Sequence, residues 1–130
     1  MQVRLDDGNV SIMATPADPW PWPASLDGPV AAPNHHRVLW ENERVRVLET
    51  MIPAGETTPI HTHQAPTVMY VVSGSSFIRR DENGAILLDT GAMDPPFVMP
   101  PVLWSEGNPA HTLENTGSDP LVVIGIELKG

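Results

Sequence analysis

The chain has no cysteine among its 130 residues. Disulfide bonds, thiolate metal ligands and cysteine nucleophiles are therefore excluded together. Aromatic residues are also scarce, at 5% of the sequence, so a core has to rest mainly on valine, isoleucine, leucine and methionine. The length is that of one ordinary domain, and a hydrophobic share of 41% is sufficient for a single globular core.

Basic residues are few as well, with seven Lys and Arg against sixteen Asp and Glu, a net charge of −9. This balance repels a phosphate backbone or an anionic lipid surface, so we expect neither a nucleic-acid nor a membrane partner. No apolar stretch approaches the ~20 residues of a membrane span. The first residues, MQVRLDDGNVSIM, lack the basic start and apolar run of a secretory signal, and we expect a cytoplasmic protein.

Proline is concentrated near the start, where six of the fifteen prolines precede residue 34. Such density favours extended backbone and disfavours helices, so we divide the chain into a Pro-rich arm, 1–37, and a folded domain, 38–130. The arm could pack on its own domain, cross to a partner subunit, or act as a lid or docking site. We predict a homodimer with residues 12–33 at the boundary, because this segment carries apolar side chains unsuited to a free tail. They are Ile12, Met13, Trp20, Trp22 and Leu26.

From residue 38 onward the sequence alternates short β-rich segments with turn signals. Asn83-Gly84 between two such segments is a strong signal for a β-hairpin. No convincing amphipathic helix interrupts the series, which predicts an all-β barrel or sandwich. The expected strands cover 44–49, 67–72, 76–80, 85–88, 102–106, 111–115 and 121–128.

Two histidines, His61 and His63, are separated by one residue. Residues i and i+2 of a strand share a face, so both imidazoles would project together. A barrel can bring a third histidine, His111, beside them. Three neutral imidazoles at ~2.0–2.1 Å suit Zn, Fe, Ni or Cu. The competing interpretation is that these histidines merely fill a polar barrel interior.

The spacing around this pair resembles the first motif of the cupin family. That motif has a glycine, five residues, a His-x-His pair, three residues, a ligand position, six residues and a second glycine. The same spacing runs here from Gly55 through His61, His63 and position 67 to Gly74, and Tyr70 to Gly74 resembles the closing strand of the motif. His111 and Asn115 match the H-x-x-x-N end of the second motif, although the preceding PxG is replaced by EGNPA. The resemblance implies a cupin-type double-stranded β-helix, or jelly roll, with inward metal-binding histidines. Among cupins, the chain is most similar to small single-domain proteins of the β-alanine-degradation type.

One position departs from the cupin pattern, because Thr67 stands where the family's glutamate ligand would fall. A hydroxyl is a poor ligand for a divalent ion, so we expect a three-histidine site, His61, His63 and His111, with open positions. Losing the carboxylate leaves the ion its full charge and makes it a stronger Lewis acid toward an anion. Gln64 is a weaker candidate because its strand parity points away from the pair.

Other polar residues have two interpretations each. Glu106 is either an inward acid or base that acts behind the ligands, or a surface acid. Arg79 and Arg80 belong either to a solvated hairpin or to the binding of a substrate carboxylate, and we favour the hairpin. For His35 and His36 we expect a solvated turn.

These residues predict one divalent ion per chain, either Fe, Zn, Ni, Mn or Cu, and a small-molecule ligand or substrate. The leading hypothesis is a metal-dependent enzyme. Resemblance to three-histidine cupin dioxygenases implies a dioxygenase if the metal is Fe, whereas Zn, Ni or Mn would support isomerase, lyase or hydrolase chemistry. The alternatives are a non-catalytic sensor or ligand-binding cupin, and an interaction protein that uses the Trp-Pro arm.

Overall fold

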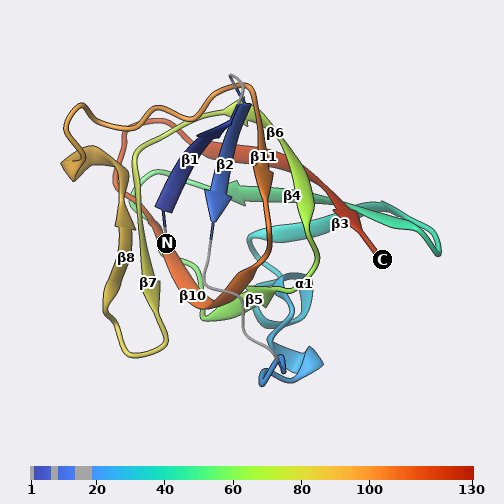
Figure 1. Ribbon diagram of the computed structural model, residues 1–130. Coiled ribbons are helices and arrows are strands. Elements are labelled where there is room, and N and C mark those ends of the chain that lie inside the picture. Colours follow the sequence, from blue (N-terminus) through green and yellow to red (C-terminus); the bar gives the residue numbers. More distant parts are fainter. Residues whose placement is uncertain (1, 7–8, 14–18) are drawn as a thin grey trace.

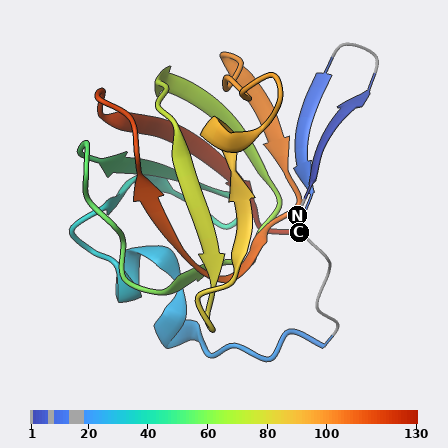
Figure 2. The ribbon, with the colours of Figure 1, turned by 90° about the vertical axis from the view of Figure 1, so that its left-hand side faces the viewer.

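The computed structural model describes residues 2–6, 9–13 and 19–130, and it consists mainly of β-strands in two sheets. Among the described strands every pairing is antiparallel except that of β2 with β9. The two sheets wrap around a common interior (Figures 1 and 2). The predicted all-β barrel is confirmed.

The larger sheet has seven strands and the smaller has four. In spatial order, the larger contains β1 (Gln2–Asp6), β2 (Asn9–Met13), β9 (Val102–Ser105), β6 (Thr67–Ser73), β11 (Leu121–Leu128), β4 (Val45–Ile52) and β3 (His36–Glu41). The smaller contains β5 (His61–His63), β10 (Asn108–Asn115), β7 (Phe77–Asp81) and β8 (Ile86–Asp89). The strands expected from the sequence correspond to β4 and β6 to β11, with ends that differ by a few residues.

The hairpin predicted at Asn83-Gly84 joins β7 to β8. Gly84 has a φ of +83°, a backbone conformation that glycine adopts without a steric penalty. The Asp81 carboxylate accepts hydrogen bonds from the backbone amides of Asn83 and Ala85, which closes the turn. The local sequence thus fixes this connection.

The core lies between the sheets and is mainly aliphatic, as the scarcity of aromatic residues predicts. Alternate residues of β11 are buried, so one face of this strand contributes to the core. Phe77 is the aromatic member of the cluster. The buried cluster comprises Ile52, Phe77, Leu88, Leu113, Leu121 and Val123.

Helical structure is limited to short segments in the described part of the chain, η1 (Ala24–Leu26), α1 (Gly28–Ala31) and η2 (Thr90–Ala92). The prediction that the proline density disfavours helices in the arm did not anticipate α1. Pro29 lies in its first turn, where the amide that proline lacks would have no helical partner. No helix among the described residues is long and apolar enough to cross a membrane.

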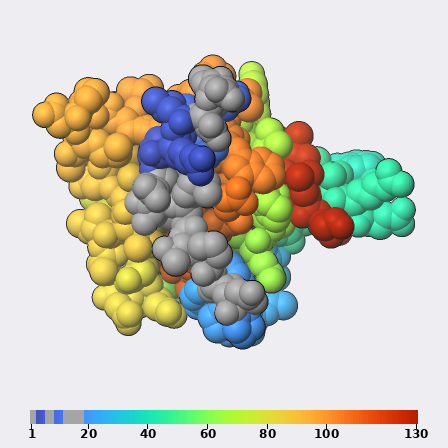
Figure 3. Space-filling model, in the orientation of Figure 1, coloured from blue at the N-terminus to red at the C-terminus, as the bar shows by residue number. Residues whose placement is uncertain are grey.

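The described part of the arm lies against the barrel of its own chain. Strand β2 extends the large sheet by pairing with β9, and hairpin β1–β2 lies beside that strand in Figure 3. Further along, Asp27 forms a β-bridge with Thr62, and Ala32 is fully buried. The rings of Trp20 and Trp22 meet edge to face at 4.8 Å. The side chains of Ile12 and Met13 lie outside the described residues, and the homodimer stays a prediction.

Candidate metal centre

Strands β5 and β10 are neighbours in the smaller sheet and bring the predicted histidines together. His61 is the register partner of His111, and His63 is that of Asn108. The ring centroids of His61 and His111 are 4.3 Å apart, and those of His61 and His63 are 4.8 Å apart. His63 and His111 are separated by 5.7 Å. His61 and His111 are each only 2% exposed, so the cluster faces the barrel interior.

A fourth histidine, His36, joins this cluster from the first position of β3. Its ring centroid lies 4.6 Å from that of His61 and 5.0 Å from that of His63. The candidate ligand atoms of these three residues lie within 4.8 Å of one another, a group that could hold a metal ion. His111 is outside that group, although it contacts His61.

The predicted solvated turn at His35 and His36 is wrong, because both side chains are buried. Helix α1 contacts both β3 and β5, and this packing places the first residue of β3, His36, beside the histidines of β5. His35 points to a different partner, since its Nε2 lies 3.0 Å from Glu56 Oε1. Only His36 therefore reaches the cluster.

Three of the four imidazoles are oriented by a backbone carbonyl. Nδ1 lies 3.0 Å from Ala32 O in His36, 2.8 Å from Pro59 O in His61 and 2.7 Å from Pro109 O in His111. A carbonyl can only accept, so each Nδ1 carries the proton and each Nε2 keeps a lone pair for a metal. Two of these carbonyls belong to a Pro-x-His sequence, Pro59 to His61 and Pro109 to His111, a repeated signal that sequence analysis missed.

The donor set fits a divalent metal ion. His36 Nε2 is buried and has no hydrogen-bond partner, an arrangement that is costly unless something else satisfies the atom. Burial, followed by the nearby His63, lowers the pKa of His36 to about 4 and that of His61 to about 2. Burial also lowers the pKa of His111 well below its ordinary value. These three imidazoles are therefore neutral at physiological pH, which is the form that binds metals.

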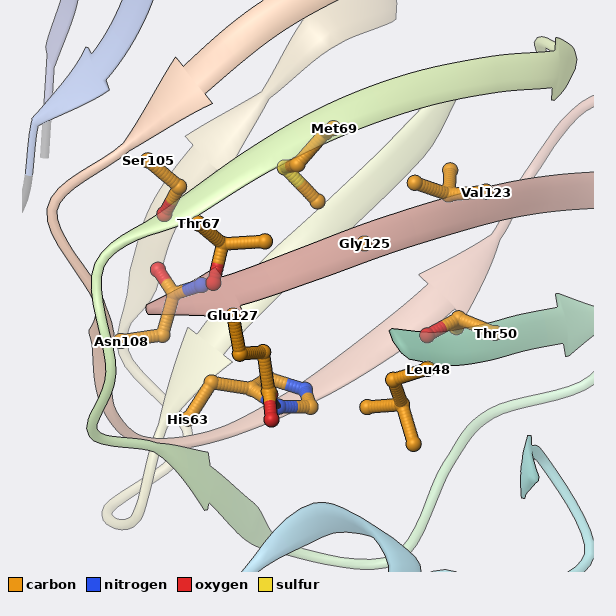
Figure 4. Close-up of a pocket in the computed structure, with 10 residues that line it drawn as sticks. All are labelled: Leu48, Thr50, His63, Thr67, Met69, Ser105, Asn108, Val123, Gly125 and Glu127. Atoms are coloured by element: carbon orange, nitrogen blue, oxygen red, sulfur yellow. Dashed lines mark ion pairs between the residues drawn. The ribbon is translucent and has the colours of Figure 1, made fainter. Parts of the chain in front are cut away.

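A carboxylate reaches the site from the strand beside Thr67. Glu127 of β11 is the register partner of Thr67 on β6, and its Oε2 lies 3.8 Å from His63 Nδ1. Figure 4 shows Glu127 beside the His63 ring, with Thr67 and Asn108 near them. Thr67 itself donates its hydroxyl to Ala65 O at 3.0 Å. The acidic group missing at position 67 is thus present on the adjacent strand.

An arginine, Arg46, connects this carboxylate to the arm. Its Nε donates to Glu127 Oε1 at 2.5 Å, and its two terminal nitrogens donate to the Asp27 carboxylate at 2.7 and 3.0 Å. Burial alone would raise the pKa of Glu127, but the contacts with His63 and Arg46 lower it, so the carboxylate is ionised. Asp27 immediately precedes α1, so Arg46 attaches the segment that leads to His36.

Gly28 lies against the cluster, and Gly28→Ala is expected to weaken metal binding. A Cβ at this position would lie 2.6 Å from His63 Cε1 and 3.4 Å from His36 Cδ2, so the rings would have to move. We expect at least a ~10-fold loss of affinity, as for changes that misorient ligands. Chelator competition measures this loss. Gly74→Ala is the matched control, because its Cβ would meet only Val71 at 3.8 Å. Equal affinity in both variants would refute the assigned role of Gly28.

Several other predicted site residues lie elsewhere. Glu106 is exposed and accepts a hydrogen bond from Trp104 Nε1 at 2.9 Å, so the prediction that it points inward is wrong. Arg80 is on the outside, where it pairs with Glu114 at 2.8 Å. Arg79 is buried instead of solvated. Gln64 is exposed.

A cavity of about 50 Å³ adjoins the histidines inside the barrel. All four histidines line it, together with Arg79, Asn108 and a largely apolar wall that includes Met69 and Phe77. A second space of about 30 Å³ shares His63, Met69 and Asn108 with the first and is also lined by Glu127. The site therefore has room for a small ligand.

Comparisons with solved structures show the cupin fold. A cupin domain from Bordetella pertussis Tohama I matches 73% of this chain and 92% of its own, with a TM-score of 0.53 and 21% identity. An RmlC-like cupin family protein with a double-stranded β-helix fold, from Methanocaldococcus jannaschii, matches 72% of this chain and 77% of its own, with a TM-score of 0.51 and 15% identity. No family model and no curated protein matches the chain. The predicted double-stranded β-helix is confirmed.

Proposed function

We propose that this protein binds one divalent metal ion through His36, His61, His63 and His111 and acts on a small organic molecule at that centre. The observation that carries the proposal is the orientation of the imidazoles. Their Nδ1 atoms are held by backbone carbonyls in three cases, and the Nε2 atom of His36 is buried without a partner. The Glu127 carboxylate lies 3.8 Å from His63 Nδ1, an electrostatic contact that is longer than a hydrogen bond.

The chain's own residues define what such a centre can do. A bound divalent ion would supply Lewis acidity, and iron would add redox chemistry. Asn108 offers an amide to a ligand in the cavity, and Glu127 offers a carboxylate that can hold the His63 ring and its Nδ1 proton in place. Apolar neighbours such as Met69 and Phe77 limit the entry of water. Isomerase, lyase, hydrolase or dioxygenase activity would depend on the metal, and kinship with the β-alanine-degradation type stays a prediction.

Metal content of histidine variants tests the proposal. His61→Ala and His111→Ala are each expected to lower metal affinity by more than ~10-fold, because a ligand should matter at least as much as the groups that orient it. Thr67→Ala should retain nearly full occupancy, since the Thr67 hydroxyl is bonded to Ala65 O. The measurement is mass-spectrometric metal analysis after loading, with chelator competition for the affinities.

His35→Ala is the matched control, because His35 is also buried but contacts Glu56. It should bind metal like the unaltered protein. Full occupancy in a His61→Ala/His63→Ala double variant would reject the proposed centre. Equal losses in Thr67→Ala and His111→Ala would show that the ligand set is wrong.

A further inference from the structure

The outer face of the large sheet, which points away from the histidine cluster, is apolar. An antiparallel sheet with one face in water normally alternates apolar and polar residues along each strand. Strand β6 instead presents Val68, Tyr70 and Val72 to the outside. Strand β11 does the same with Ile126 and Leu128. Strands that are apolar on both sides are usual where both faces of a sheet are buried.

The strand register makes these side chains neighbours across the sheet. Tyr70 of β6 is the register partner of Val102 on β9 and of Ile124 on β11. On the other side of β11, Val122 is the register partner of Met51 on β4. We call the outward side chains of β9, β6, β11, β4 and β3 the outer patch. The patch is continuous across these five strands.

The outer patch is larger than the apolar patches of most monomeric proteins. Six of its side chains are between 40% and 57% exposed, namely Trp40, Met51, Tyr70, Val72, Val102 and Ile126. They leave roughly 600 Å² open to water, at the upper end of what a typical monomer exposes in one patch. Val68 and Leu128 bring the total close to the ~800 Å² that each partner contributes to a standard protein interface.

The outer patch carries no net charge, although the chain as a whole has a charge of −9. At the outward positions of these five described strands, the charged residues are Arg37 and Glu49. They are register partners and form an ion pair at 3.2 Å, so their charges cancel. Two chains of the same negative charge repel each other, and a neutral apolar patch is where this repulsion opposes contact least.

We propose that two copies of this protein form a dimer by packing their outer patches face to face. Two twisted sheets of the same hand pack well in this way, about 10 Å apart and with their strands about 30° from parallel. A two-fold axis through the patch closes the contact at two chains. Tyr70 and Ile124 lie on β6 and β11, inside the sheet, and would be near the middle of the interface. The arm, residues 12–33, is then not the boundary between subunits.

Light scattering of the full chain across a concentration series tests the dimer. The unaltered protein should have the mass of two chains. Ile126→Glu should weaken dimerisation at least ~30-fold, because each dimer would bury two carboxylates without a partner at an interface. Ile86→Glu is the matched control, since Ile86 is exposed on β8, a strand of the smaller sheet, and this variant should dimerise like the unaltered protein.

Tyr70→Ala decides the question if Ile126→Glu does not fold. The Tyr70 side chain is exposed, so its removal leaves no cavity in the core, and dimerisation should weaken ~10-fold or more. Trp22→Ala tests the arm in the same way and should leave the dimer intact. The proposal is overturned by an unaltered protein that is monomeric at every concentration, or by a dimer that survives both Ile126→Glu and Tyr70→Ala. A dimer lost in Trp22→Ala but kept in Tyr70→Ala would assign the contact to the arm and overturn it as well.

Discussion

The metal-free protein is expected to lose most of its stability as the pH falls from about 6.5 to about 4. The unfolded chain takes up protons on its histidines near pH 6.5, whereas the folded chain keeps His36 neutral down to about pH 4 and His61 to about pH 2. The unfolded state therefore binds more protons in this window, and stability falls with pH. The contribution of the neutral histidines to the free energy of unfolding is fully present above pH 6.5, the unfolded pKa, and is lost progressively as the pH falls below it toward the folded pKa.

The size of the effect follows from the pKa difference. For His36, a shift from 6.5 to about 4 corresponds to roughly 3 kcal/mol of unfolding free energy, at about 1.4 kcal/mol per unit. His61 contributes a loss of similar size by pH 4, so the two together reach the lower part of the ~5–15 kcal/mol typical of a domain, and the lowered pKa of His111 acts in the same direction. We expect a slope of about 4 kcal/mol per pH unit near pH 5.

Urea unfolding in the presence of a chelator, at several pH values between 7.5 and 4, measures this dependence. His36→Gln removes one of the three groups and should lower the slope by about 1.4 kcal/mol per pH unit. A saturating divalent metal should move the onset of unfolding to lower pH, because the ion binds only the neutral imidazoles. A free energy of unfolding that stays constant from pH 6.5 to 4.5 would show that the histidines are not held neutral.

Much of the fold could be predicted because its signals are local. Alternation along β4, the Asn83-Gly84 turn and the His-x-His pair of β5 each depend on residues a few positions apart. Strand parity places His61 and His63 on one face whatever the rest of the chain does. His111 could be added because a barrel brings distant strands together, and it proved to be the register partner of His61.

The missed residues depend on contacts between distant segments. His36 reaches the cluster because α1 packs on β5 and because β3 pairs with β4, and neither contact leaves a periodic pattern around residue 36. Glu127 lies at the site only through its register with Thr67. Strand parity indicates that Glu106 and Trp104 share a face of their strand, but it does not indicate whether that face points into the barrel. The buried neighbour Ser105 shows that Glu106 points outward.

The ion pairs of Arg46 with Glu127 and Asp27 are expected to stabilise the folded protein, and a variant of Arg46 tests this. Arg46→Met is expected to destabilise the protein by about 3–5 kcal/mol, the usual loss when one partner of a buried ion pair is removed. The Glu127 side chain is only 4% exposed and would keep its charge without the arginine. Asp27 would lose both of its hydrogen bonds to Arg46, which weakens the attachment of the segment that carries His36.

Urea unfolding of Arg46→Met and Arg37→Met separates this effect from an ordinary surface pair. Arg37 lies 3.2 Å from Glu49, but its side chain is 71% exposed, so its removal should cost less than about 1 kcal/mol. Adding Glu127→Gln to Arg46→Met should recover part of the stability, because the uncompensated charge disappears. The metal affinity of this double variant should stay below that of the unaltered protein. His63 then lacks the carboxylate near its Nδ1, and Asp27, which precedes α1, lacks its hydrogen bonds to Arg46. If Arg46→Met cost no more than Arg37→Met, the three residues would be an ordinary surface group with no part in assembling the histidine cluster.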